Sequence, residues 1–285
     1  MRRRGFAALL IGLLAACSPV ANGPPAARLD RDKLDAGVDA QIGGLGTCVV
    51  LADAKTGAQV YQYGHFDVCT RPLPPCSTFD MVNETIGLDA GLITPQTVFQ
   101  WDGSPQPAKL WEADADLAQA SRSGMAWWHQ RLARLVGRDR FVRALSAFDY
   151  GSKDPAGPAD GFWLGPQTGG GLTVSTRQQV EFLKRFYGGG LPIRPQTAAA
   201  VQALIPAETR TDPKGGQATI SGVAASCASL ADGSRNVGWW IGRLRTPQRD
   251  LIFAASVEGA QAPPGLEIER RLKAVFADAG LWPAG

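Results

Sequence analysis

Patterns typical of β-strands lie near both ends of the chain and enclose a helical middle part. Residues 47–63 are predicted to form a strand, a turn and a second strand, because two apolar runs flank a short Lys-Thr-Gly sequence. Strand patterns return at 219–226, 237–243 and 251–257. This order, with 34 glycines and 20 prolines, argues against a helical bundle. The 285 residues, 45% of them hydrophobic, can bury a sizeable core in one domain.

Helical patterns fill the middle of the chain and close it. Predicted helices run over 77–88, 124–136, 140–148, 177–187 and 267–279. The clearest is 124–136, where Trp128 and Leu132 lie on one side and Arg131 and Arg134 on the other, as in an amphipathic helix. Gly137 marks its end. The chain therefore combines strands at both ends with helices between them.

Pro75-Cys76-Ser77-Thr78-Phe79-Asp80, followed by Trp101-Asp102-Gly103, carries the most specific motif. The stretch resembles the active-site segment of the class D (oxacillinase-type) serine β-lactamases, which reads P-x-S-T-F-K and later W-D-G. Further matches to that family lie at 150–152, 162–164, 178–183 and 237–242. The resemblance covers about residues 46–257 and implies the β-lactamase/transpeptidase-like fold, an α/β fold of the α+β type. There an antiparallel sheet from both termini packs against an inserted helical subdomain, here about 92–190, with the serine at their junction.

The positions that are catalytic in this family are altered. Ser77 stands at the nucleophile position, but Asp80 replaces the lysine that serves, usually carboxylated, as the general base. Serine without a base is a poor nucleophile. Gly124 replaces the proton-shuttling serine of the S-x-V motif, and Val223-Ala224-Ala225 replace the K-T-G that holds the substrate carboxylate. The resemblance therefore implies an inherited fold with an impaired reaction.

On the binding side, the resemblance points to Tyr150 and Trp163 together with Val223, Ala224 and Ala225. Trp163 matches the tryptophan that packs beside the modified lysine in the family. The sequence offers no zinc spacing and no phosphate loop, so we expect no metal and no cofactor.

Asp80 admits two interpretations. Ser77-x-x-Asp80 before an apolar run is a helix capping-box pattern, and an acid also suits a helix N-terminus. Alternatively, Asp80 replaces the lysine carbamate as the base. Its side chain falls short by roughly 5 Å, so that role needs a bridging water. We favour capping.

The N-terminus resembles a bacterial lipoprotein signal. Arg2-Arg3-Arg4 precedes a short apolar stretch, and Leu14-Ala15-Ala16-Cys17 resembles a lipobox, cleaved before a cysteine that is then lipidated. We expect a signal peptide over 1–16, a lipidated Cys17 with a flexible tether over 17–30, and a domain over 31–285. Cleavage removes three arginines, so the net charge of +3 falls to zero and gives no electrostatic case for nucleic acid.

Export makes disulfides possible. Beyond Cys17, four cysteines allow three full pairings. We favour a bridge between Cys69 and Cys76, which flank a short proline-rich loop, with Cys48 and Cys227 unpaired.

These features predict an outer-membrane lipoprotein that faces the periplasm and carries a class D β-lactamase-like domain. The leading hypothesis for its function is binding or scaffolding without turnover, with a peptidoglycan peptide, a β-lactam or another envelope protein as the partner. One alternative is a slow serine β-lactam acylase that uses Ser77 with Asp80 and water. Another is a drifted paralogue with no dedicated ligand.

Overall fold

The computed structural model describes residues 28–44, 46–212 and 215–283. The expected signal peptide, Cys17 and most of the tether lie outside these residues. The strands are β1 (Thr47–Asp53), β2 (Gln59–Tyr63), β3 (Val98–Phe99), β4 (Ala115–Asp116), β5 (Ala207–Thr211), β6 (Gln217–Ala228), β7 (Asn236–Arg245) and β8 (Asp250–Gly259). The helices are α1 (Arg31–Ile42), α2 (Phe66–Cys69), α3 (Asp80–Asp89), α4 (Leu117–Ser123), α5 (Ala126–Val136), α6 (Arg138–Ala147), α7 (Thr176–Gly188), α8 (Pro195–Leu204) and α9 (Gly265–Asp278), with short 3-10 turns η1 (Cys76–Phe79), η2 (Lys109–Trp111) and η3 (Pro166–Thr168).

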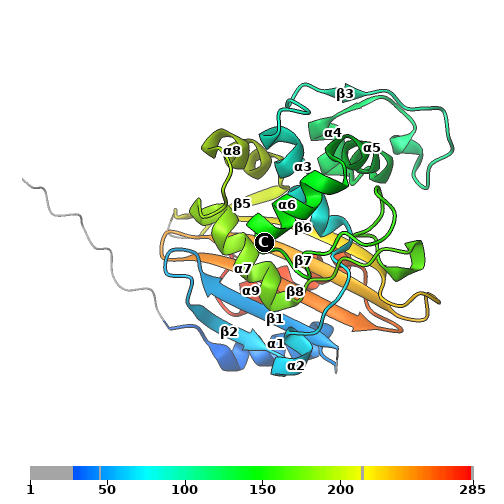
Figure 1. The fold of residues 1–285 in the computed structure, drawn as a ribbon. Helices are drawn as coiled ribbons and strands as arrows, with labels where there is room; N and C mark the ends of the chain where they lie inside the picture. The colour runs from blue at the N-terminus through cyan, green and yellow to red at the C-terminus, as the bar shows by residue number, and fades with distance from the viewer. Residues whose placement is uncertain (1–27, 45, 213–214, 284–285) are drawn as a thin grey trace, which may run out of the picture.

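A six-stranded antiparallel sheet in the order β2-β1-β8-β7-β6-β5 forms the centre of the molecule. The N-terminal strand β1 pairs with the C-terminal strand β8 over seven residues, so both ends of the described chain contribute to one sheet (Figure 1). The strands predicted at both ends, and the sheet expected from the resemblance, are confirmed.

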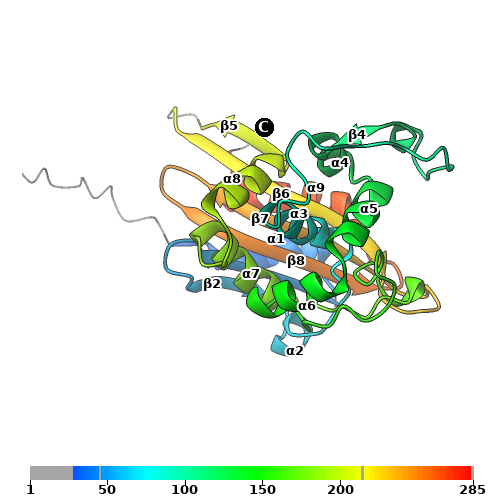
Figure 2. The ribbon, with the colours of Figure 1, turned by 45° about the horizontal axis from the view of Figure 1, so that its top comes forward.

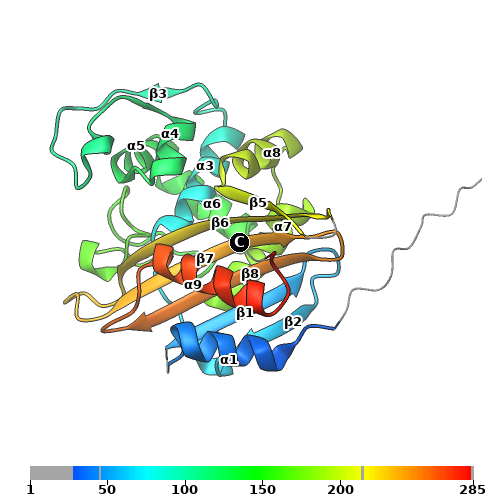
Figure 3. The same cartoon turned by 180° about the vertical axis from the view of Figure 1, so that it is seen from behind.

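Helices cover both faces of the sheet. Helices α1 and α9 pack on one face, as the view from behind shows (Figure 3). Helix α7 packs on β8 and β1 from the other face, where α3, α4, α5, α6 and α8 form a helical part beside the sheet (Figure 2). Consecutive side chains of a strand point to opposite faces, and accordingly Trp239 belongs to the core on the helical side and Trp240 to the core under α1 and α9.

Four helices lie where the sequence predicted none, namely α1, α2, α4 and α8. The predicted helix over 124–136 instead begins at Ala126, because Gly124 ends α4 in the left-handed conformation with φ of 60°. The predicted helix over 77–88 is divided into the turn η1 and helix α3. Across the described ranges, no helix is long and apolar enough to cross a membrane.

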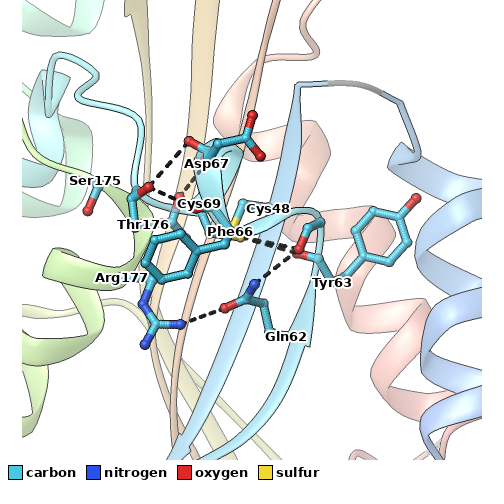
Figure 4. Close-up of a disulfide and its surroundings, with 12 residues drawn as sticks. Cys48, Gln62, Tyr63, Phe66, Asp67, Cys69, Ser175, Thr176 and Arg177 are labelled. Carbon is cyan, nitrogen blue, oxygen red and sulfur yellow. Dashed lines mark hydrogen bonds between the residues drawn. A yellow bond between two sulfur atoms is a disulfide. The ribbon is translucent and has the colours of Figure 1, made fainter.

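The predicted pairing of the cysteines is wrong. Cys48 is bonded to Cys69, and Cys76 is bonded to Cys227 (Figure 4 shows the first bridge). Although Cys69 and Cys76 are close in sequence, α2 packs on β1 whereas η1 packs on β6, so their side chains meet different strands. All four cysteines of the domain are therefore paired, and one of the two bridges joins the motif that contains Ser77 to β6.

Candidate active site

Ser77 lies in the short turn η1, which is fixed to both halves of the molecule. Cys76, directly before it, has φ of 51° and donates its backbone N–H to the carbonyl oxygen of Trp163. Its sulfur is bonded to Cys227 of β6. On the other side, the indole nitrogen of Trp239 donates to the carbonyl oxygen of Pro74 at 2.9 Å. These contacts hold Ser77 at the junction of sheet and helices, as the resemblance predicted.

A pocket of about 360 Å³ opens at Ser77. Its walls come from α3, the end of α4, the segment after α8, strand β6 and the start of α9. Among the predicted site residues it brings together Ser77, Asp80, Gly124, Val223 and Ala224. Ala225 is buried and is not part of the lining. These residues, predicted from local motifs far apart in the sequence, thus lie around one pocket.

The side chain of Asp80 belongs to a buried cluster that was not predicted. Its Oδ2 lies 3.6 Å from Nδ1 of His129, which comes from α5. Nε2 of the same ring lies 2.9 Å from Oε1 of Glu84, one helical turn after Asp80 on α3. Ser121 of α4 places its hydroxyl 2.5 Å from the same Glu84 oxygen. Two carboxylates and one hydroxyl that line the pocket thus meet the buried imidazole of His129.

The surroundings of both ring nitrogens of His129 favour an imidazolium. Nδ1 lies 3.0 Å from the carbonyl oxygen of Met125, which can only accept a hydrogen bond, and Nε2 faces a carboxylate. Burial on its own would lower the pKa of His129, but the charges of Asp80 and Glu84 outweigh it and raise that pKa to about 9. Both nitrogens therefore donate at neutral pH.

Burial has the opposite effect on Asp80 and raises its pKa to about 6, against the charge of His129, which lowers it. The Ser77 hydroxyl is near enough to lower it as well, although in the described structure it makes no hydrogen bond of normal geometry with this carboxylate. Oδ1 of Asp80 is buried and has no hydrogen-bond partner within the described part of the chain. The carboxylate of Asp80 is thus more basic than that of an ordinary aspartate, and one of its oxygens has no hydrogen-bond partner among the described residues.

The capping interpretation of Asp80 is wrong. Helix α3 begins after Phe79 without a hydrogen bond from a capping side chain, and Ser77 lies inside η1 and not at an N-cap. Asp80 does lie in the first turn of α3, where an acid is favoured by the helix dipole. Its side chain, however, turns inward to His129, because α5 packs along α3.

Tyr150 and Trp163 lie behind the pocket and do not line it. Both are buried and pack around Phe79, with ring centroids 5.9 and 5.3 Å away. The indole nitrogen of Trp163 is buried and has no hydrogen-bond partner among the described residues. In the family, according to the resemblance, this tryptophan packs beside the modified lysine. Here the lysine position holds a shorter acid that is directed toward His129.

The wall of β6 carries no charge where the pocket meets it. Gly222, Val223 and Ala224 line the pocket from this strand. On the helical side, Gly124 has open space around its α-carbon, but its φ of 60° disfavours other residues. The nearest hydroxyls on that side belong to Ser121 and Ser123, which line the pocket as well. Among the described residues, no group of three or more His, Cys, Asp or Glu side chains is arranged to hold a metal ion.

Comparison with known proteins identifies the family. Residues 47–274 match the family model of the penicillin binding protein transpeptidase domain. The chain belongs to this family, in its class D serine β-lactamase-like group. It is 29% identical to β-lactamase OXA-48 of Klebsiella pneumoniae over 185 residues, and this aligned region covers 65% of each chain. It is 29% identical over 216 residues to the regulatory protein BlaR1 of Bacillus licheniformis, covering 75% of this chain but 34% of that protein.

Solved structures agree with this assignment. The class D β-lactamase of Bacillus subtilis superposes with a TM-score of 0.74 at 25% identity and covers 87% of this chain and 97% of its own. The C-terminal domain of the Bacillus licheniformis BlaR penicillin receptor superposes with a TM-score of 0.73 at 24% identity, covering 88% of this chain and 96% of its own. The class D β-lactamase fold expected from the sequence is therefore confirmed.

Sequence reasoning missed Glu84, Ser121 and His129. The spacing of Asp80 and Glu84 by four residues was a signal, because such positions share one face of a helix. A histidine among the apolar residues of the 124–136 segment was a second signal. Neither revealed that the two helices place these side chains against each other.

Proposed function

We propose that this chain is a lipid-anchored module that faces the periplasm and binds a β-lactam or a peptidoglycan peptide at Ser77 without turning it over. The observation that carries this proposal is the place of Asp80. Its carboxylate stands at the position of the family's base, but Oδ2 lies 3.6 Å from Nδ1 of the buried His129. A general base must reach its proton directly or through one water, and Asp80 is near Ser77 without a hydrogen bond of normal geometry to its hydroxyl.

The remaining walls of the pocket support binding rather than catalysis. Gly124 offers no hydroxyl for a proton transfer to a leaving nitrogen, and Val223 and Ala224 offer no cation from β6. The loss of a base and of a proton shuttle costs about 10²–10⁴-fold each. The pocket combines apolar side chains with an equal number of polar or charged ones, and sites of small ligands likewise join apolar surface to polar groups that fix the orientation of the ligand.

The relatives give the proposal its ligand class. The family model is named for penicillin binding, and one structural neighbour is a penicillin receptor domain. The lipid anchor rests on the sequence alone, through Leu14-Ala15-Ala16-Cys17.

A second candidate is slow formation of an acyl-enzyme by Ser77. It is favoured by one observation, the raised pKa of Asp80, about 6, in the same pocket as Ser77. A carboxylate with that pKa is a better base than an ordinary aspartate. In this mechanism a water bridges Asp80 and the Ser77 hydroxyl, and the serine oxygen attacks the carbonyl carbon as its proton moves to the water and on to Asp80. The β-lactam C–N bond then breaks, and the leaving nitrogen takes that proton from Asp80 through the water.

One experiment separates the two candidates. The purified domain is incubated with benzylpenicillin and followed by intact mass and by calorimetric titration, while a chromogenic cephalosporin reports hydrolysis. We expect reversible binding, no stable mass increase and no measurable hydrolysis. A mass increase that disappears in Ser77→Ala would establish the acylase instead, and turnover abolished by Ser77→Ala would overturn the pseudoenzyme. Absence of any binding would overturn both.

A further inference from the structure

Arg122 is the one cation among the residues that line the Ser77 pocket in the described chain. It lies in the last turn of α4, on the helical side of the pocket, whereas the positions that have lost the family's K-T-G motif lie on β6. Its side chain is exposed. A positive charge is thus still present at this pocket, but it comes from another wall.

The acidic residues of the pocket have partners of their own. Glu84 contacts the imidazolium of His129, which also faces Asp80. Glu269 forms an ion pair with Lys273, with 2.7 Å between Oε1 and Nζ. Arg122, by contrast, makes no ion pair and no hydrogen bond with any residue that the structure describes. The end of a helix is a favourable place for a cation. The N–H groups of this guanidinium nevertheless have no acceptor among the described residues.

The charged side chains of the pocket differ in their exposure to solvent. Asp80 is only 8% exposed, whereas Arg122 is exposed to solvent. Met81, Val223 and Leu266 supply apolar surface to the same pocket. This arrangement fits a ligand with an apolar body and a carboxylate that remains near solvent. An arginine can bind such a carboxylate with two parallel hydrogen bonds.

We propose that Arg122 binds the carboxylate of the ligand, and so replaces from α4 the anchoring group that β6 no longer provides. This inference rests on the proposed function and names the residue that selects acidic ligands. It makes Arg122 a binding residue with no part in proton transfer.

The test compares two ligands that differ only in this charge, benzylpenicillin and its methyl ester. Their dissociation constants are measured by calorimetric titration for the wild type, Arg122→Gln and Arg122→Lys. The matched control is Arg143→Gln, which removes an exposed arginine of α6 that does not line the pocket. Thermal melting of each variant verifies that it is folded.

We expect the wild type and Arg143→Gln to prefer the acid over the ester by about 10-fold, the usual effect of one charge-assisted hydrogen bond. Arg122→Gln should bind both ligands equally, because it loses affinity for the acid alone, and Arg122→Lys should retain part of the preference. If Arg122→Gln keeps the full preference, or if the wild type binds acid and ester equally well, the role of Arg122 is overturned while ligand binding stands. If the wild type binds neither ligand, the proposed function fails and the role of Arg122 fails with it.

Discussion

Nε2 of His129 lies 2.9 Å from Oε1 of Glu84, and both side chains are buried beside the pocket that contains Ser77. The second nitrogen of the ring faces the carbonyl oxygen of Met125, so the histidine carries two protons. An imidazolium from α5 therefore faces the acid that stands at the position of the family's lysine on α3. An unpaired buried charge is costly, and each member of the cluster depends on the others.

The charge of His129 should make the stability depend on pH. Its pKa is about 9 in the folded protein and about 6.5 in an unfolded chain. Between these values the folded state holds a proton that the unfolded state has lost, so stability falls as pH rises through the window. We expect His129→Gln to flatten the decline in melting temperature between about pH 6.5 and 9.

The other histidine provides the control for this measurement. His65 is exposed, so His65→Gln should leave the pH dependence as in the wild type. Identical slopes in the wild type and both variants would mean that His129 is neutral in the folded protein.

Restoring the family's lysine should harm the fold and not revive the reaction. Asp80→Lys places a second cation against the buried His129, and disruption of a buried ion pair costs about 3–5 kcal/mol. Gly124, Val223 and Ala224 remain unaltered, so hydrolysis should not return. Asp80→Asn, which adds no charge, should lose less stability. Strong penicillin labelling of Asp80→Lys at an unchanged melting temperature would contradict this account of Asp80.

The two disulfides should differ in their contribution to stability. Cys76 and Cys227 are separated by 151 residues, and Cys48 and Cys69 by 21. In the chain-entropy model the longer loop stabilises by about 2 kcal/mol more. Urea unfolding should therefore show a larger loss for the double variant Cys76→Ser/Cys227→Ser than for Cys48→Ser/Cys69→Ser. The reverse order would indicate that local packing outweighs loop entropy here.

The lipid anchor predicts where the protein is found. If Cys17 is lipidated, Cys17→Ser should move the protein from the membrane fraction to the soluble fraction and leave the melting temperature of the domain unchanged. Metabolic labelling with a palmitate analogue provides an independent readout. A mutant that stays in the membrane fraction would show that another feature holds it there.

The sequence by itself determined the strands at both ends and the Ser77 motif, because these depend on residues that are neighbours in the chain. It also indicated which catalytic positions are altered, since Asp80, Gly124 and Val223 are recognised from local motifs. Its predictions for the cysteine pairing and for capping by Asp80 were wrong. In both cases the decision depends on elements distant in sequence that pack together.

Only the tertiary structure decided what surrounds Asp80. On the isolated helix α3, an acid in the first turn has its best interaction with the helix dipole. The packing of α5 against α3 brings His129 within 3.6 Å of that acid and 2.9 Å of Glu84, where all three side chains are buried. Electrostatic attraction is stronger there than at the surface, because the surrounding dielectric is low. The ion pair therefore outweighs the local preference, and no pattern along the chain shows which helix will supply the cation.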